Sequence, residues 1–235
     1  MFSLGDVAGL VLVYAYVVLV VSLAAWARKR IPDCDHRKVI HILVGNIVFL
    51  WWVFDDRWTM SLLAALPFVL VLLMAVPGSP FKRLTGSFLD EATEQGHGYG
   101  LVYYAVSWTL LALLLFDDRM VAGIAIAAMS FGDGLGGLLG KRYGRRRLYH
   151  NKTYVGTVGV FLGTAISALA VMAFYTFLSG HLPQLGVPEL TPISAVAAAV
   201  AAGAFVAVVE LFSPGEYDNL IVPLSTAALL LLIGL

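Results

Sequence analysis

The stretch from Ser130 to Thr157 reads SFGDGLGGLLGKRYGRRRLYHNKTYVGT. It begins as the apolar end of a segment long enough to cross a membrane and continues into a polar loop. The polar loop holds six of the fifteen basic residues of the chain. Asp133 lies within the apolar part, where a carboxylate is costly unless it faces protein, water or a cation. This acid predicts a functional site at the end of a membrane helix.

The glycines of this stretch allow two interpretations. If the segment stays helical to Arg142, then Asp133, Gly137 and Lys141 recur every four residues and share one face. Asp133 and Lys141 then lie two turns apart, roughly 12 Å by helical rise, which is about the reach of a metal-bound triphosphate. A spacing of four is also typical of close helix packing. It occurs on the neighbouring face at Gly132, Gly136 and Gly140.

Composition indicates an integral membrane protein. Hydrophobic residues make up 60% of the chain, charged residues 13%, and mean hydropathy is +0.87, far more apolar than an ordinary soluble domain. A single cysteine excludes an internal disulfide. We predict an all-α, polytopic helical bundle with about eight transmembrane helices, forming one membrane domain over 1–235. The predicted spans are Val7–Ala27, Val39–Phe54, Thr59–Val76, Leu101–Phe116, Met120–Leu139, Tyr154–Leu178, Pro192–Phe212 and Leu220–Leu235.

The distribution of basic residues predicts the orientation. Thirteen of the lysines and arginines fall in alternate loops on one side, whereas only Arg57 and Arg119 fall on the other. Cytoplasmic loops carry the excess of positive charge, so both termini are expected outside. The positive charges of the first span follow its apolar run, which is typical of an anchor. We expect a prokaryotic cell membrane, with the site facing the cytoplasm.

The other cytoplasmic loops contribute further polar residues. Glu210 lies within an apolar run near its inner end, where burying a carboxylate is costly and therefore indicates a function. Asp218 and Asn219 precede the last span, where capping of a helix is an alternative to a role in a site. Arg37, Lys38 and His41 open the second span, where snorkelling at the interface is the alternative to binding an anion.

The polar residues on this side suit phosphoryl transfer. Asp133, Glu210 and Asp218 are possible ligands of magnesium, which takes hard oxygen donors together with a phosphorylated substrate. Lys141 and Lys152 are possible phosphate ligands, and Gly156-Thr157 at a helix start offers free N–H groups and a hydroxyl to an anion. Phosphoryl transfer mainly requires positioning and charge neutralisation. The soluble P-loop pattern is absent, so a nucleotide site here is of a membrane-specific type.

Four motifs together resemble the polyprenol kinase family, which includes dolichol kinase and phytol kinase and is related to the CTP-dependent phosphatidate cytidylyltransferases. They are Arg37-Lys38-x-x-His41, GDxxGxxxGKxxG over 132–144, Asn151-Lys152-Thr153-x-x-Gly156-Thr157, and Glu210 to Pro223 with its Ser213-Pro214 and Asp218-Asn219 pairs. The resemblance implies Mg²⁺-dependent transfer of phosphate, typically from CTP, to the hydroxyl of a long isoprenoid alcohol. Family members typically carry an acid in a KxxEGT-like signature, where this chain has Tyr154 and Val155. The role of that acid is left unassigned.

The predicted roles are as follows. Asp133 and Asp218 hold magnesium, Lys141 and Lys152 neutralise charge on the transferred group and the leaving CDP, and Glu210 orients or deprotonates the alcohol. The alternative is that Glu210 and Asp218 exchange these roles. The remaining candidates, which bind the nucleotide, are Arg37, Lys38, His41, Gly137, Gly140, Thr153, Gly156, Thr157 and Asn219. For Arg37 and His41, the head of the lipid is the alternative ligand.

Two alternatives stand beside the kinase. A cytidylyltransferase that makes a CDP-activated lipid shares the Asp, glycine and lysine stretch, but its PGHGGxxDRxD pattern is absent. A small transporter or channel would need a path of polar residues across the membrane. Asp133 and Glu210 both lie toward the cytoplasmic ends of their spans, and no matching polar residues continue from them to the outer side. CTP is expected over ATP only through the resemblance. The predicted partners are a nucleotide, an isoprenoid alcohol and the bilayer, with no nucleic acid.

Overall fold

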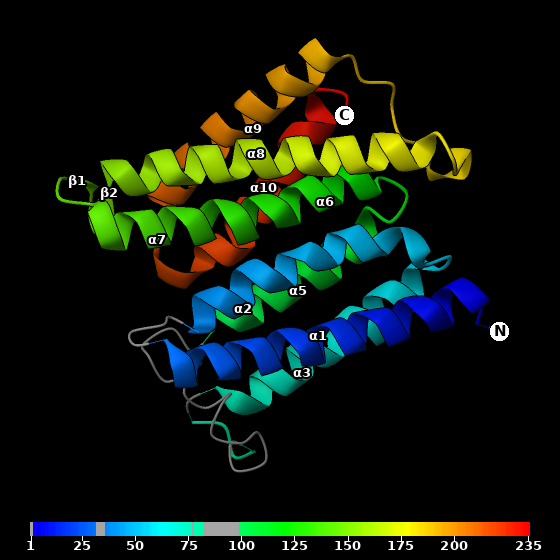
Figure 1. Ribbon diagram of the computed structural model, residues 1–235, viewed down its shortest axis with the longest axis horizontal. Helices are drawn as coiled ribbons and strands as arrows, with labels where there is room; N and C mark the ends of the chain where they lie inside the picture. The colour runs from blue at the N-terminus through cyan, green and yellow to red at the C-terminus, as the bar shows by residue number, and fades with distance from the viewer. Residues whose placement is uncertain (1, 32–35, 77, 82–98) are drawn as a thin grey trace. The chain divides into compact units, whose positions relative to one another are not determined.

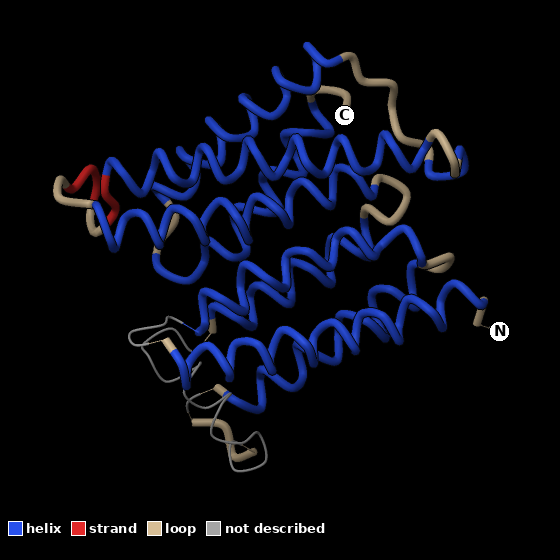
Figure 2. The backbone as a smooth tube through the Cα atoms, in the orientation of Figure 1, coloured by secondary structure: helices blue, strands red, loops and turns tan. Residues whose placement is uncertain are grey.

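The computed structural model describes residues 2–31, 36–76, 78–81 and 99–235, without the side chains at positions 28, 36 and 37. Nearly all of the regular structure is helical (Figures 1 and 2), which confirms the all-α prediction. The chain separates into two compact units, Met1–Leu114 and Leu115–Leu235. One membrane domain over 1–235 stays a prediction.

In the first unit the long helix α1 (Leu4–Arg30) begins at a reciprocal side-chain cap. Ser3 Oγ accepts the N–H of Asp6 at 2.9 Å, and the Asp6 carboxylate accepts the N–H of Ser3 at 3.3 Å. Asp6 also accepts the N–H groups of Asp55 and Asp56, at 3.1 Å each, which ties the helix start to a distant turn. The other elements of this unit are α2 (His36–Val44), η1 (Gly45–Val53), η2 (Thr59–Ala65), α3 (Leu66–Ala75) and α5 (Gly100–Leu114).

The second unit contains the Ser130 to Thr157 stretch. A continuous helical segment is followed by a short antiparallel hairpin and three further long helices (Figure 1). Its elements are α6 (Arg119–Ala127), η4 (Ala128–Gly132), α7 (Asp133–Tyr143), β1 (Arg147–Tyr149), β2 (Lys152–Thr153), α8 (Tyr154–Ser179), η5 (Pro183–Leu185), α9 (Pro192–Phe212), η6 (Gly215–Tyr217) and α10 (Asp218–Leu232).

The segment that carries Asp133 is not a uniform α-helix. The turn η4 (Ala128–Gly132) is π-helical and joins α6 to α7 without a break in the helix. Such single π-turns inside α-helices occur frequently at functional sites. The segment stays helical past Arg142, because α7 ends at Tyr143, so the condition under which Asp133 and Lys141 share one face is met. Asp133 is the first residue after the π-turn.

The described helices have the character of a membrane protein. Four are long and apolar enough to cross a membrane, and three shorter apolar helices accompany them. All eight predicted spans correspond to helical segments within the described residues, although eight membrane crossings remain a prediction. Large apolar side chains such as Ile166, Phe177 and Val208 lie exposed on α8 and α9, as expected for helix faces that contact lipid.

Glycines allow α7 and α8 to approach closely. A Cβ atom added to Gly136 would lie 2.9 Å from the carbonyl oxygen of Gly156, and one added to Gly159 would lie 3.0 Å from the Cα of Gly136. These distances leave no room for larger residues, so the glycine faces of the two helices meet directly. The packing interpretation of Gly132, Gly136 and Gly140 is therefore confirmed. This contact fixes the position of Asp133 relative to the start of α8.

Candidate active site

Three carboxylates from three helices meet in the second unit. Asp133 begins α7, Glu210 lies in the last turn of α9, and Asp218 begins α10. One carboxylate oxygen of each lies within 4.8 Å of the others. We call these three residues the acidic cluster. Like charges in a partly buried position repel one another unless cations balance them, so the cluster indicates a binding site for positive charge.

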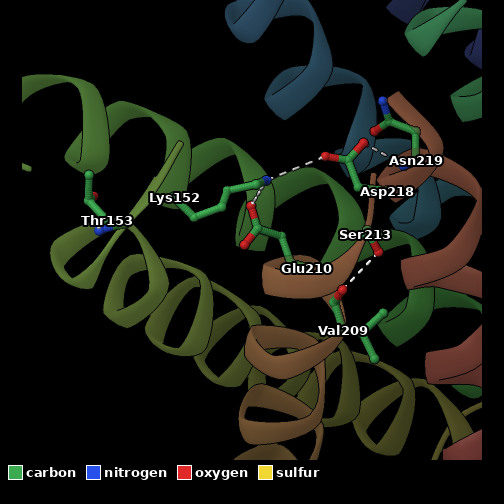
Figure 3. A network of polar contacts seen from close by, with 8 residues as sticks. Lys152, Thr153, Val209, Glu210, Ser213, Asp218 and Asn219 are labelled. Atoms are coloured by element: carbon green, nitrogen blue, oxygen red, sulfur yellow. Dashed lines mark hydrogen bonds and ion pairs between the residues drawn. The ribbon is translucent and has the colours of Figure 1, made fainter. Parts of the chain in front are cut away.

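The turn between α9 and α10 brings Glu210 and Asp218 together. The N–H and Oγ of Ser213 both donate to the carbonyl oxygen of Val209, at 2.9 and 2.8 Å, and end α9 (Figure 3). Gly215 follows with a φ of +55°, a conformation that favours glycine. Asp218 then accepts the N–H of Asn219 at 2.8 Å. The chain reverses within a few residues, which places the second carboxylate beside the first.

Lys152 brings a positive charge to the acidic cluster. Its Nζ donates to Glu210 Oε1 and lies 3.8 Å from Asp218 Oδ2 (Figure 3). The β1–β2 hairpin delivers this lysine, with Arg147 paired to Thr153 and Tyr149 paired to Lys152. The hairpin turns the chain back from an exposed loop to the start of α8. The hairpin therefore places Lys152, one of the six basic residues of this region, at the acidic cluster.

Burial and charge shift the proton affinities at the site. Burial and the neighbouring Asp133 carboxylate raise the pKa of Asp218 to about 7, against the lowering effect of Lys152. Burial lowers the pKa of Lys152, but the carboxylates of Glu210, Asp218 and Asp133 together outweigh this effect, so the pKa of Lys152 lies above its ordinary value. The lysine therefore stays protonated. Within this group of four residues, one ammonium faces three carboxyl groups.

The donor set of the acidic cluster fits a divalent cation. Magnesium takes oxygen ligands at about 2.0–2.1 Å, so ligands on opposite sides of one ion lie about 4 Å apart. Ligand atoms within 4.8 Å of one another are close to that spacing. The sequence predicts Asp133 and Asp218 as metal ligands. Glu210, a possible ligand by sequence that is assigned there as the base, lies within the same spacing.

The start of α8 is held by Thr153. Its Oγ1 accepts the N–H of Gly156 at 3.1 Å, as an N-cap side chain does. One expectation is thereby corrected, because the Gly156 N–H is used inside the protein and is not free for an anion. Gly140 packs against the start of α8, because an added Cβ there would lie 3.1 Å from Thr153 Oγ1 and 3.3 Å from the Cα of Gly156.

Loss of this cap is expected to have a measurable cost. Thr153→Ala removes the acceptor for the Gly156 N–H and should lower the free energy of unfolding by about 1 kcal/mol. Thr153→Ser keeps an acceptor oxygen and should retain most of the stability. Thermal unfolding of both variants in detergent micelles checks this. Equal melting temperatures for Thr153→Ala and the wild type would show that the cap does not stabilise α8.

Thr157 offers a buried hydroxyl in the first turn of α8. Its Oγ1 is buried and has no hydrogen-bond partner within the described structure. Helix α9 packs against α8 at Gly203, where an added Cβ would lie 2.8 Å from the carbonyl oxygen of Phe161. Glu210 follows Gly203 by two turns of α9. Because α8 and α9 run antiparallel, Glu210 then lies level with the first turns of α8. An unsatisfied buried hydroxyl there is available to a ligand, so the predicted role of Thr157 stays a prediction with support.

The other predicted residues are distributed as follows. Lys141 is exposed in the last turn of α7, two turns beyond Asp133, and Gly137 lies between them on the same face. Lys38 and His41 belong to α2 of the first unit, where the buried His41 ring contacts Tyr104 at 4.6 Å between centroids. The side chain of Arg37 lies outside the described residues. Nucleotide contacts by these residues and by Asn219 remain predictions.

Three features of the site are missed by sequence reasoning. The first is the contact of Lys152 with Glu210, which joins residues far apart in the chain. The second is the π-turn before Asp133, for which the sequence carries no distinct signal. The short Lys152–Thr153 strand is also unpredicted, although the arginines and Asn151 around it mark a polar turn.

A helical membrane protein with a carboxylate and lysine site at its helix ends fits the class of integral membrane phosphotransferases. No family model matches the chain, and no solved structure matches it. It is 30% identical to a phytol kinase of Synechocystis sp. over 81% of this chain and 76% of the relative. It is 25% identical to the chloroplastic phytol kinase 1 of Arabidopsis thaliana over 91% of this chain and 70% of the relative.

A third relative is named for a different alcohol. The chloroplastic farnesol kinase of Arabidopsis thaliana is 26% identical over 64% of this chain and 51% of the relative. The chain belongs to the polyprenol kinase family. It is accordingly an enzyme, a kinase of the polyprenol type.

Proposed function

We propose that this protein transfers the γ-phosphoryl group of CTP to the hydroxyl of an isoprenoid alcohol, giving the alkyl monophosphate and CDP. The observation that carries the proposal is the acidic cluster of Asp133, Glu210 and Asp218 with Lys152 against it. The relatives named phytol kinase and farnesol kinase support phytol and farnesol as the first alcohols to test. CTP as donor rests on the resemblance of the motifs to the polyprenol kinases.

Magnesium is the proposed cofactor, held by the acidic cluster. When bound, it would neutralise negative charge on the nucleotide phosphates. Asp133 and Asp218 are assigned as its ligands, and Glu210 lies close enough to join them. Lys152 lies beside the same carboxylates and would stabilise charge that develops on the transferred group. Lys141, two turns along α7, would contact the leaving CDP.

The bond changes balance with this set of residues. The alcohol oxygen forms a bond to the γ-phosphorus, and the bond from that phosphorus to the β,γ-bridging oxygen breaks. CDP leaves with the electron pair of the broken bond. The hydroxyl proton passes to Glu210, which is only 5% exposed and lies at the end of the apolar helix α9. Like Asp133, Glu210 belongs to a helical segment long and apolar enough to cross the membrane, where a lipid substrate can reach it.

The membrane defines where the alcohol lies. Its isoprenoid chain would rest against the exposed apolar faces of α8 and α9, with the hydroxyl at the helix ends beside the acidic cluster. The basic loop before the hairpin supports a cytoplasmic position for these ends. We propose a prokaryotic cell membrane as the location. Among the relatives, the Synechocystis sp. kinase is cyanobacterial and the plant kinases are named chloroplastic.

One assay tests the proposed function. Purified protein in detergent is given magnesium, CTP or ATP labelled at the γ-phosphate, and phytol, farnesol or a longer polyprenol, and the lipid phase is extracted. We expect label in the lipid, more from CTP than from ATP, with release of CDP. Unlabelled lipid with every alcohol would overturn the proposal. Pyrophosphate release on addition of phosphatidic acid would then identify a CDP-lipid synthase.

A further inference from the structure

The ammonium of Lys152 occupies a position that the proposed metal also requires. It donates to Glu210 Oε1 and lies 3.8 Å from Asp218 Oδ2. Those two carboxylates and Asp133 form the acidic cluster, with ligand atoms within 4.8 Å of one another. Figure 3 shows Lys152 extended between Glu210 and Asp218. The lysine is therefore itself a cation bound to the carboxylates that are proposed to hold magnesium.

A lysine ammonium and a divalent cation compete for the same carboxylates. Both use carboxylate oxygens, and two positive charges within a few ångströms repel strongly where the surroundings are poorly solvated. Glu210 is only 5% exposed, so its contact with the ammonium is weakly screened by water. A cation that enters must therefore either displace the ammonium or bind beside it at an electrostatic cost.

The position of Lys152 in the chain allows such a displacement. It lies in a strand of two residues, and 30% of its side chain remains exposed. The lysine side chain is a flexible four-carbon stem with a compact charge, which can rotate toward another anion. A nucleotide triphosphate that arrives with its metal offers such an anion. The phosphate oxygens would accept the ammonium while the metal takes over the carboxylates.

We propose that Lys152 is an internal counter-ion that keeps free divalent cations off the acidic cluster until a nucleotide triphosphate draws its ammonium away. This inference rests on the proposed function, because it assigns the cluster to a metal that accompanies the nucleotide. It implies that the enzyme takes up metal and nucleotide together. Binding of each then favours the other, since coupling between two ligands is reciprocal.

Binding of Mn²⁺ measured by electron paramagnetic resonance tests the inference without the kinase reaction. The full chain in detergent is titrated with Mn²⁺ in the absence of nucleotide. Lys152→Met removes the charge at similar length and should tighten Mn²⁺ binding about tenfold. Lys152→Arg keeps the charge and should bind Mn²⁺ as weakly as the wild type. Arg142→Met removes a positive charge from the exposed end of α7 and serves as the matched control, with no change expected.

Two further measurements identify the site and the coupling. The double variant Lys152→Met, Asp133→Asn should lose the tight binding, which locates it at the acidic cluster. A non-transferable CTP analogue should tighten Mn²⁺ binding in the wild type beyond the binding of Mn²⁺ to the analogue alone. The same analogue should add little in Lys152→Met, because no competitor is left to remove.

The outcomes separate this inference from the proposed function. Unchanged or weaker Mn²⁺ binding in a Lys152→Met protein that unfolds at the wild-type temperature would overturn the counter-ion role. Tight nucleotide-free binding in the wild type would overturn it as well. Both results are compatible with labelled lipid in the kinase assay. Failure of the proposed function appears as wild-type protein that labels no lipid.

Discussion

Asp133→Asn is expected to lower the rate of lipid phosphorylation by about 10²–10³-fold, the size of effect seen when one electrostatic group is removed from an active site. The change keeps the shape of the side chain and removes its charge. Asp133 is the member of the acidic cluster that belongs to the glycine-packed helix α7, so its position depends on no loop. Its loss would leave Glu210 and Asp218 as the two remaining carboxylates.

The measurement is incorporation of labelled γ-phosphate into phytol or farnesol at several magnesium concentrations. We expect the variant to need more magnesium for half-maximal rate, because a metal ligand is missing. Asp118→Asn is the matched control, since it is the same chemical change in an exposed residue at the other end of the same helical segment. An Asp133→Asn enzyme with wild-type rate and magnesium dependence would exclude the proposed role of Asp133.

Gly163→Ala is expected to lower the free energy of unfolding by about 1–3 kcal/mol, the usual cost of overpacking a buried position. A Cβ there would lie 2.5 Å from the carbonyl oxygen of Phe131 and 3.1 Å from the Cα of Gly132. Both atoms belong to the backbone at the π-turn, so no side-chain rotation relieves the overlap. The higher helix propensity of alanine offsets only about 1 kcal/mol of the cost.

This variant also tests how the site is held. Because Gly132 precedes Asp133, a shift of the helix away from α8 would move the carboxylate as well. We therefore expect a lower melting temperature together with a lower kinase rate in protein that is still folded. Gly180→Ala is the control, as its added Cβ would lie no closer than 3.4 Å to a neighbouring atom. Equal stability of the two variants would contradict the packing argument.

The sequence alone indicates the helical membrane fold and the residues that carry charge at unusual places. Long apolar runs require helices in a bilayer, because backbone groups there must be bonded within the segment. Asp133 and Glu210 are recognisable because each interrupts such a run, and Asp218 because it belongs to a motif at the last helix start. The order of the motifs also indicates the polyprenol kinase family, which the relatives confirm. These properties are local along the chain and need no knowledge of contacts.

The tertiary structure decides which of these residues act together. From the sequence alone, the glycines of α7 could serve helix packing or phosphate binding. The close contact with α8 shows that they serve packing. The sequence treats Lys141 and Lys152 alike, whereas the hairpin brings Lys152 to Glu210 and leaves Lys141 exposed. Glu210 enters the acidic cluster because α9 runs antiparallel to α8. Pairings of this kind depend on helix register and chain reversal, which join residues far apart in sequence and leave no periodic signal along the chain.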